Sequence, residues 1–274
     1  MTTVSAKRDA RTALLTGAGG GLLSGVLGGG GGAVMIPLMT GLMRMRQHVA
    51  HGTSLVIITF SALAGGITYS LQEHVDVRLV GILAAASVAG AYLGVRGSTL
   101  VPGLRLRQIL GAFLILVALR LLLFRDVTPV FTVGGLAEVG IASGIGLVGG
   151  TASGLLGVGG GSIFVPALVL LLGVGQHEAQ GVSIWVIVFS SAVGSFTHYR
   201  QGTVDMPAAR MIVPTAIPAG VAGSLVATLL SSGKLQLLFS VILVFLGLQM
   251  LVTATRRLRD GTKNAILRTE TTTV

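Results

Sequence analysis

Several long windows of this sequence contain almost no charged residue, and they constrain the fold more than any other feature. Residues 52–71 and 235–253 are almost entirely apolar. A helix of about 20 apolar residues spans roughly 30 Å of hydrocarbon. Only 10% of the chain is charged and 52% is hydrophobic, so there is too little polar surface to cover a soluble core. The sequence therefore predicts an all-α polytopic membrane protein in contact with the lipid bilayer.

The basic residues lie between the apolar segments and near the ends of the chain. A net charge of +10 could suggest nucleic acid as a partner. This placement instead indicates helix ends held on the cytoplasmic side and contact with anionic lipid, so no nucleic acid is expected. Five basic residues follow the last apolar segment and predict a basic cytoplasmic tail over 254–274: Arg256, Arg257, Arg259, Lys263 and Arg268.

The chain repeats itself at an offset of 129 residues. Residues 24–76 and 153–205 align without gaps and are identical at 22 of 53 positions. Membrane composition alone does not explain the matched polar residues, which include Gln47 and Gln176, His48 and His177, and Asp76 and Asp205. Tandem repeats within one membrane chain are typical of secondary transporters. We expect transmembrane repeat 1 at 12–124, a linker at 125–133 and transmembrane repeat 2 at 134–253.

Each repeat contains a run of glycines inside an apolar stretch. The two stretches read SGVLGGGGGAVMIPLM at 24–39 and SGLLGVGGGSIFVPAL at 153–168. In hydrocarbon, non-helical backbone is tolerated only where protein or a water-filled cavity surrounds it. We therefore expect a glycine-broken helical hairpin in each repeat, with short returning helices at 33–43 and 162–172. About three transmembrane helices should follow each hairpin.

The distribution of Lys and Arg favours inverted repeats. If each hairpin returns to the side it entered and the N-terminus is cytoplasmic, 15 of the 19 Lys and Arg residues lie inside and 4 outside. If the segment crosses once, the division is 13 to 6. The positive-inside rule prefers the first arrangement. Each repeat then crosses an odd number of times, so the second repeat is inverted and both termini are cytoplasmic.

The short helices that follow the glycines are predicted to bind an anion at their N-termini. A helix N-terminus carries roughly half a positive charge and unused N–H donors, and glycine lets a ligand approach the backbone. Inverted repeats would bring the two ends together near the bilayer midplane. The alternative is that glycines only pack helices, as we expect from Gly17 to Gly25, which keep a four-residue spacing. The candidate substrate-binding glycines are Gly30, Gly31, Gly32, Gly159, Gly160 and Gly161.

Three serines are further candidates for the substrate site. Ser61 and Ser190 match each other in the repeat and fall in the middle of apolar segments. Their hydroxyls could donate to an anion or bond to the preceding helical turn. Ser162 falls in the first turn of its short helix, where it could cap the helix or contact the ligand.

Acidic residues are sparse, and one of them is a candidate for ion coupling. Glu138 lies in GGLAEVGIASG, where a carboxylate could reach hydrocarbon depth or the water at a helix end. Asp76 and Asp205 precede apolar segments and are expected to be helix N-caps. No catalytic constellation, metal-ligand set or cofactor motif is evident in the sequence, so we predict neither an enzyme nor a cofactor.

The duplicated phrase SG[VL]LG-x-GGG-x-x-x-x-P is followed by QH-x-A-x-G-x-S and a downstream Val-Asp. This pattern resembles the sulfite exporter TauE/SafE family, which overlaps with the toluene-sulfonate uptake permeases. The resemblance covers residues 12–253, with the phrase at 28–37 and 157–166. It implies an integral inner-membrane transporter of sulfite, sulfonates or related small organic anions. The two half-sites differ, because Gly29 and Ala33 correspond to Val158 and Ser162.

A secondary carrier that exports a sulfur oxyanion or sulfonate is the leading hypothesis. With a negative cell interior, expelling one negative charge is favoured by about 2.3 kcal/mol per 100 mV. Three alternatives stay open: an anion channel, an uptake permease that needs a coupled cation or proton, and a membrane protein whose glycines only pack helices. The sequence also leaves a homo-oligomer open.

Overall fold

The computed structural model describes residues 3–98, 103–123 and 135–272, and these residues form ten helices and no strand. The helices are α1 Thr3–Val26, α2 Gly32–Gly41, α3 Gln47–Leu71, α4 Val77–Gly97, α5 Gly103–Leu123, α6 Leu136–Leu156, α7 Gly161–Leu172, α8 Gln176–Arg200, α9 Met206–Leu229 and α10 Ser232–Thr272. Among the described residues, six helices are long and apolar enough to cross a membrane: α3, α4, α6, α8, α9 and α10. The predicted all-α polytopic membrane protein is confirmed. The linker expected at 125–133 lies outside the described residues.

The same order of helices occurs twice along the chain. Helices α2, α3, α4 and α5 begin 129 residues before α7, α8, α9 and α10 respectively. Helices α3 and α8 have the same length, 25 residues each. The offset found in the sequence therefore also separates the starts of these helices.

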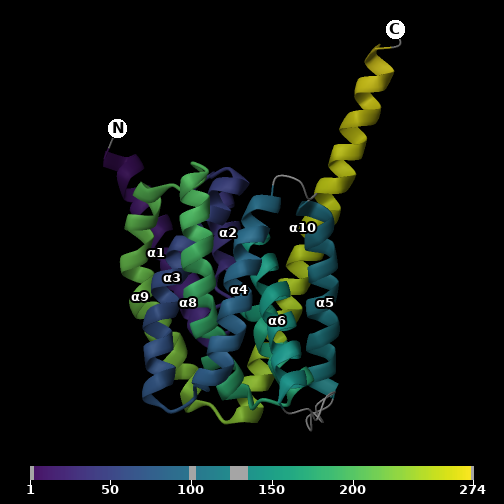
Figure 1. The fold of residues 1–274 in the computed structure, drawn as a ribbon. Coiled ribbons are helices and arrows are strands. Elements are labelled where there is room, and N and C mark those ends of the chain that lie inside the picture. Colours follow the sequence, from purple (N-terminus) through teal and green to yellow (C-terminus); the bar gives the residue numbers. More distant parts are fainter. Residues whose placement is uncertain (1–2, 99–102, 124–134, 273–274) are drawn as a thin grey trace.

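Helices α3 and α8, which correspond to each other in the two halves, run antiparallel. A Cβ added at Gly52, near the start of α3, would meet the carbonyl of Thr203, just beyond the end of α8. In the same way, a Cβ added at Gly181, near the start of α8, would meet the carbonyl of His74, just beyond the end of α3. Figure 1 shows the start of α1 and the end of α10 on the same side of the bundle.

The first helix of each half packs closely on a helix of the other half. A Cβ on Gly17, Gly21 or Gly25 of α1 would meet backbone atoms of α9. In the same way, a Cβ on Gly146, Gly150 or Gly154 of α6 would meet backbone atoms of α4. Small residues allow such close approach, which supplies van der Waals contact where no hydrophobic force drives helices together. The packing role expected from Gly17 to Gly25 is confirmed.

Helix α10 is much longer than the bundle. It has 41 residues and continues beyond the other helices in Figure 1, so the expected tail over 254–274 is helical up to Thr272. Its first half is antiparallel to α5, with which it packs closely where Gly111 meets Gly247. Together α5 and α10 lean on α6, α7 and α8.

The N-caps predicted for two of the long helices are confirmed. Asp76 Oδ1 accepts hydrogen bonds from the amides of Arg78 at 2.8 Å and Leu79 at 3.1 Å. Asp205 Oδ1 accepts one from the amide of Ala208 at 3.0 Å. These carboxylates satisfy amides that have no partner within the helix.

Candidate functional site

Both predicted helix interruptions are present in the interior of the bundle. We call residues 27–31, between α1 and α2, the first glycine loop, and residues 157–160, between α6 and α7, the second glycine loop. Gly159 and Gly160 have φ of +93° and +84°, a left-handed region in which a side chain is strained. These two positions therefore need glycine for conformational reasons alone.

The two glycine loops touch each other. A Cβ at Gly32 would meet the carbonyl of Gly157, and one at Gly159 would meet the carbonyl of Gly29. A Cβ at Gly161 would lie 2.6 Å from the carbonyl oxygen of Gly28. All residues of both loops are buried. The structure thus brings the predicted glycines of both repeats together, packed backbone to backbone.

Each loop is held by a serine from the other half of the chain. Ser54 Oγ of α3 lies 2.8 Å from the carbonyl oxygen of Gly157 and donates to it, while also lying 2.7 Å from the carbonyl oxygen of His51. Ser183 Oγ of α8 donates to the carbonyl oxygen of Gly28 at 2.9 Å. Sequence reasoning missed both serines as site residues. The signal was available, because they match at the repeat offset and end the QH-x-A-x-G-x-S pattern.

The starts of α2 and α7 contain buried backbone N–H groups without a hydrogen-bond acceptor in the protein. Within the described residues, seven of these amides donate to no protein acceptor: Gly30, Gly31, Gly32, Gly159, Gly160, Gly161 and Ser162. The hydroxyl of Ser162, which is 1% exposed, also has no protein partner. A buried polar group without a partner costs about 1–3 kcal/mol. The arrangement therefore presents unused donors at two helix N-termini, the type of site that binds anions.

The other two candidate serines bond within their own helices. Ser61 Oγ donates to the carbonyl oxygen of Ile58 at 3.3 Å, and Ser190 Oγ donates to that of Ile187 at 3.4 Å. Both side chains are fully buried. A direct contact with substrate stays a prediction for both residues.

Glu138 lies at an end of the bundle. It occupies the first turn of α6, its side chain is 25% exposed, and its Oε2 lies 4.0 Å from a guanidinium nitrogen of Arg78. This position is well removed in the helix from the second glycine loop, which begins 19 residues later at Gly157. Its role in ion coupling stays a prediction.

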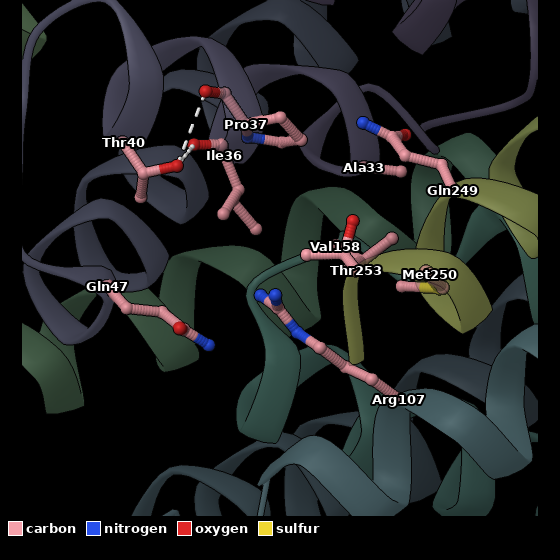
Figure 2. A pocket seen from close by; sticks show the side chains of 10 residues that line it. All are labelled: Ala33, Ile36, Pro37, Thr40, Gln47, Arg107, Val158, Gln249, Met250 and Thr253. Carbon is pink, nitrogen blue, oxygen red and sulfur yellow. Dashed lines mark hydrogen bonds between the residues drawn. The ribbon is translucent and has the colours of Figure 1, made fainter. Parts of the chain in front are cut away.

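A cavity lined by both polar and apolar residues adjoins the glycine loops on the side of α2. It has a volume of about 130 Å³. Its lining comes from α2, α3, α5, α10 and the second glycine loop: Ala33, Ile36, Pro37, Thr40, Gln47, Arg107, Val158, Gln249, Met250 and Thr253. Figure 2 shows the guanidinium of Arg107 and the amide of Gln47 pointing into this space from different helices. Sequence reasoning did not find this cavity, although Arg107 and Gln249 are polar residues in largely apolar helices.

Arg107 connects the cavity to the second glycine loop. A terminal guanidinium nitrogen of Arg107 lies 3.0 Å from His51 Nε2. Because the guanidinium is always protonated, it donates, and this His51 nitrogen accepts without a proton of its own. The backbone of His51 in turn lies directly against Gly157.

The fold and the site define a polytopic membrane protein with two interrupted helices that meet at its centre, a plan typical of secondary transporters. The chain belongs to the sulfite exporter TauE/SafE family, whose model matches residues 2–121 and 142–273. It is thus a membrane transporter and not an enzyme.

Curated relatives support the same class. The chain is 30% identical over 260 residues to the probable membrane transporter protein YunE of Bacillus subtilis, covering 84% of this chain and 94% of the relative. It is 32% identical over 225 residues to a probable membrane transporter protein of Xylella fastidiosa, covering 80% and 85%. No solved structure matches the chain significantly.

Proposed function

We propose that this protein is a secondary carrier that exports a small sulfur-containing anion, sulfite or a sulfonate, across the inner membrane. One observation carries the proposal. The facing starts of α2 and α7 contain buried amide N–H groups that donate to no protein acceptor. An anion at this position would accept several of these hydrogen bonds and would interact favourably with both helix dipoles.

The chemistry of the donors suits a compact oxyanion. Sulfite and sulfonates carry three oxygens, so they accept hydrogen bonds from several directions at once. The glycines leave the amides accessible to a ligand that approaches closely. Ser162 adds a neutral hydroxyl donor at the start of α7.

The proposed mechanism is alternating access between two inverted repeats. The antiparallel arrangement of α3 with α8 and of α5 with α10 supports inversion. We infer that both termini are cytoplasmic and that the glycine loops lie near the bilayer midplane. The site would open to each side in turn as one repeat rocks on the other.

The membrane potential supports export as the proposed direction. Export of one negative charge is favoured by about 2.3 kcal/mol per 100 mV when the interior is negative, so a uniporter suffices. Uptake would need a coupled cation or proton, for which Glu138 is the candidate.

The test is flux of sulfite and of methanesulfonate in proteoliposomes that contain the purified protein, with and without an imposed potential. We expect saturable flux that follows the potential without a pH gradient and that shows counterflow. Flux without saturation or counterflow would indicate a channel. Absence of flux for both anions would refute the proposed substrate class.

A further inference from the structure

The polar side chains of the cavity beside α2 are of the kind that bind anions. Arg107 supplies a guanidinium, and Gln47, Gln249 and Thr253 supply amide and hydroxyl donors. No carboxylate is among the residues that line it. A guanidinium binds oxyanions through two parallel hydrogen bonds, which makes arginine the preferred side chain for this purpose.

The cavity also leads to the glycine loops. Ala33, in the first turn of α2, and Val158, in the second glycine loop, both line it. The contact of Arg107 with His51 joins the same cavity to the neighbouring Gly157. An anion bound beside Arg107 would therefore lie close to the N–H groups at the starts of α2 and α7 that have no protein acceptor.

The repeat places a second arginine at the other end of the bundle. At the offset of 129 residues, Arg107 of α5 corresponds to Gln236 of α10, and Gln249 of α10 corresponds to Arg120 of α5. Each end thus has one arginine from α5 and one glutamine from α10. Gln236 lies beside the turn that carries Arg120, since its Nε2 donates to the carbonyl oxygen of Leu121 at 3.0 Å.

The two ends differ in how deeply their matching residues are buried. Thr40 and Gln47 are half-buried and line the cavity. Their counterparts Val169 and Gln176 are buried, where α5 and α10 lean on α7 and α8. Gln176 is 5% exposed, and neither its amide oxygen nor its amide nitrogen has a partner among the described residues. The second end therefore encloses the polar side chain of Gln176 without a hydrogen-bond partner among the described residues.

We propose that Arg107 and Arg120 are the cationic ligands of two binding positions for the transported anion, one on each side of the glycine loops. In this structure a cavity is lined by Arg107, while Gln176 at the other end is buried. The cavity of about 350 Å³ at that end is lined by Gln236 but not by Arg120 or Gln176. This inference rests on the proposed transport function. It names the residue that binds the anion on each side of the glycine loops. In the opposite state, α5 and α10 lean toward α2 and α3, which closes the cavity at Arg107 and opens the space at Arg120, Gln176 and Gln236.

The chain contains no cysteine, so a single introduced thiol reports on the cavity directly. We would modify Thr253→Cys with a membrane-impermeant maleimide in the presence and absence of methanesulfonate. At ten times its Kd, methanesulfonate should slow modification about tenfold, because only about a tenth of the sites are then empty. The matched control is Thr255→Cys, an exposed position two residues further along α10 that does not line the cavity.

Substitution of the arginines tests their roles separately. Arg107→Gln should raise the Kd for methanesulfonate by about 10- to 100-fold, and Arg107→Lys by less, since hydrogen bonds to charged groups are the stronger ones. Arg120→Gln should slow transport but leave this Kd within about twofold. Arg96→Gln is the control for loss of one positive charge, because Arg96 is exposed on α4 and stacks over Tyr92 at 4.5 Å.

The outcomes separate this inference from the proposed function. One set of results would overturn the two arginine sites and leave the transport function standing. In that set, sulfonate flux is normal, methanesulfonate does not protect Thr253→Cys, and the Arg107→Gln variant is active. Protection by phosphate without any flux of sulfite or methanesulfonate would overturn the substrate class but support the sites. Protection by phosphatidylglycerol instead of free anions would make the cavity a lipid site and overturn the inference. The thiol assay does not depend on whether the arginine variants fold.

Discussion

Ser54 Oγ and the carbonyl oxygen of Gly157 lie 2.8 Å apart, although 103 residues separate them in the chain. The same relationship occurs between Ser183 and Gly28 at 2.9 Å. Each half of the protein therefore fixes the glycine loop of the other half. A movement of one half relative to the other must be accommodated at these two hydrogen bonds.

Replacing either serine by alanine should destabilise the protein. Ser54→Ala and Ser183→Ala should each lower the free energy of unfolding by about 1 kcal/mol, because each leaves a buried carbonyl without its donor. The double variant should lose more than the sum, since the loops touch each other. Thermal unfolding in detergent measures both effects. Ser195→Ala is the control, because Ser195 is half-buried on α8 and bonds only to its own helix. A loss no larger than that of Ser195→Ala would show that other contacts hold the loops.

A methyl group at Gly160 should damage the centre of the protein. Its φ of +84° costs a non-glycine residue about 1–2 kcal/mol, and the added Cβ would lie 2.7 Å from the ring of Phe164. Gly144→Ala on α6 is the matched control, because no atom lies within 4 Å of the added Cβ. We expect Gly160→Ala to lower the unfolding temperature and the sulfite flux, and Gly144→Ala to change neither appreciably. Equal behaviour of the two variants would contradict the requirement for glycine.

The repeat also points to a stabilising substitution. Glu73 follows α3 with φ of +59°, while its counterpart Gly202 follows α8 with φ of +69°. Glu73→Gly should raise the free energy of unfolding by about 0.5–1 kcal/mol, because relief of the strain exceeds the entropy lost by glycine. Gly202→Ala should have the opposite sign, since its added Cβ has open space and only the strain acts. Both changes can be read from thermal unfolding, and two changes of the same sign would refute the argument.

The loop between α3 and α4 should make stability depend on pH. The rings of His74 and His177 stack with centroids 5.0 Å apart. Burial lowers the pKa of His74 from its ordinary value of 6.5, and the nearby His177 lowers it further. The folded protein therefore favours neutral His74, so stability is lost as the pH falls from about 6.5 through the lower folded pKa.

The measurement is the unfolding temperature between about pH 7.5 and pH 5.5. His74→Asn should lose less stability over this range than the unchanged protein. His177→Asn should have a smaller effect in the same direction, because it removes only the second cause. An unchanged pH dependence in His74→Asn would rule out this residue as the source.

The helix interruptions were predictable because consecutive glycines in an apolar stretch leave few alternatives. The short helices expected at 33–43 and 162–172 begin one residue earlier, at Gly32 and Gly161. The uncharged window 52–71 captured the end of α3 but not its start at Gln47. Hydropathy does not register polar residues that belong to the first turns of a membrane helix.

The contacts that define the site could not be read from the sequence. Arg107 counts as one more basic residue on the cytoplasmic side when only topology is considered. Its contact with His51 joins α5 to α3 and arises only from the tertiary arrangement. The direct contact between the glycine loops could not be predicted either. It is a backbone contact, and backbone geometry rather than residue type determines which backbone groups touch.

The hydrogen bonds of Ser54 and Ser183 to the glycine loop of the other half have a consequence for biosynthesis. The carbonyl of Gly28 receives its donor from Ser183, which is synthesised 155 residues later. During synthesis, α1 and α2 therefore enter the membrane with an incomplete loop, and α1 also lacks α9, the helix on which it packs. With the loops at the proposed depth in the bilayer, the polar backbone of the first half has no partner from α8 or α9 until those helices have been inserted.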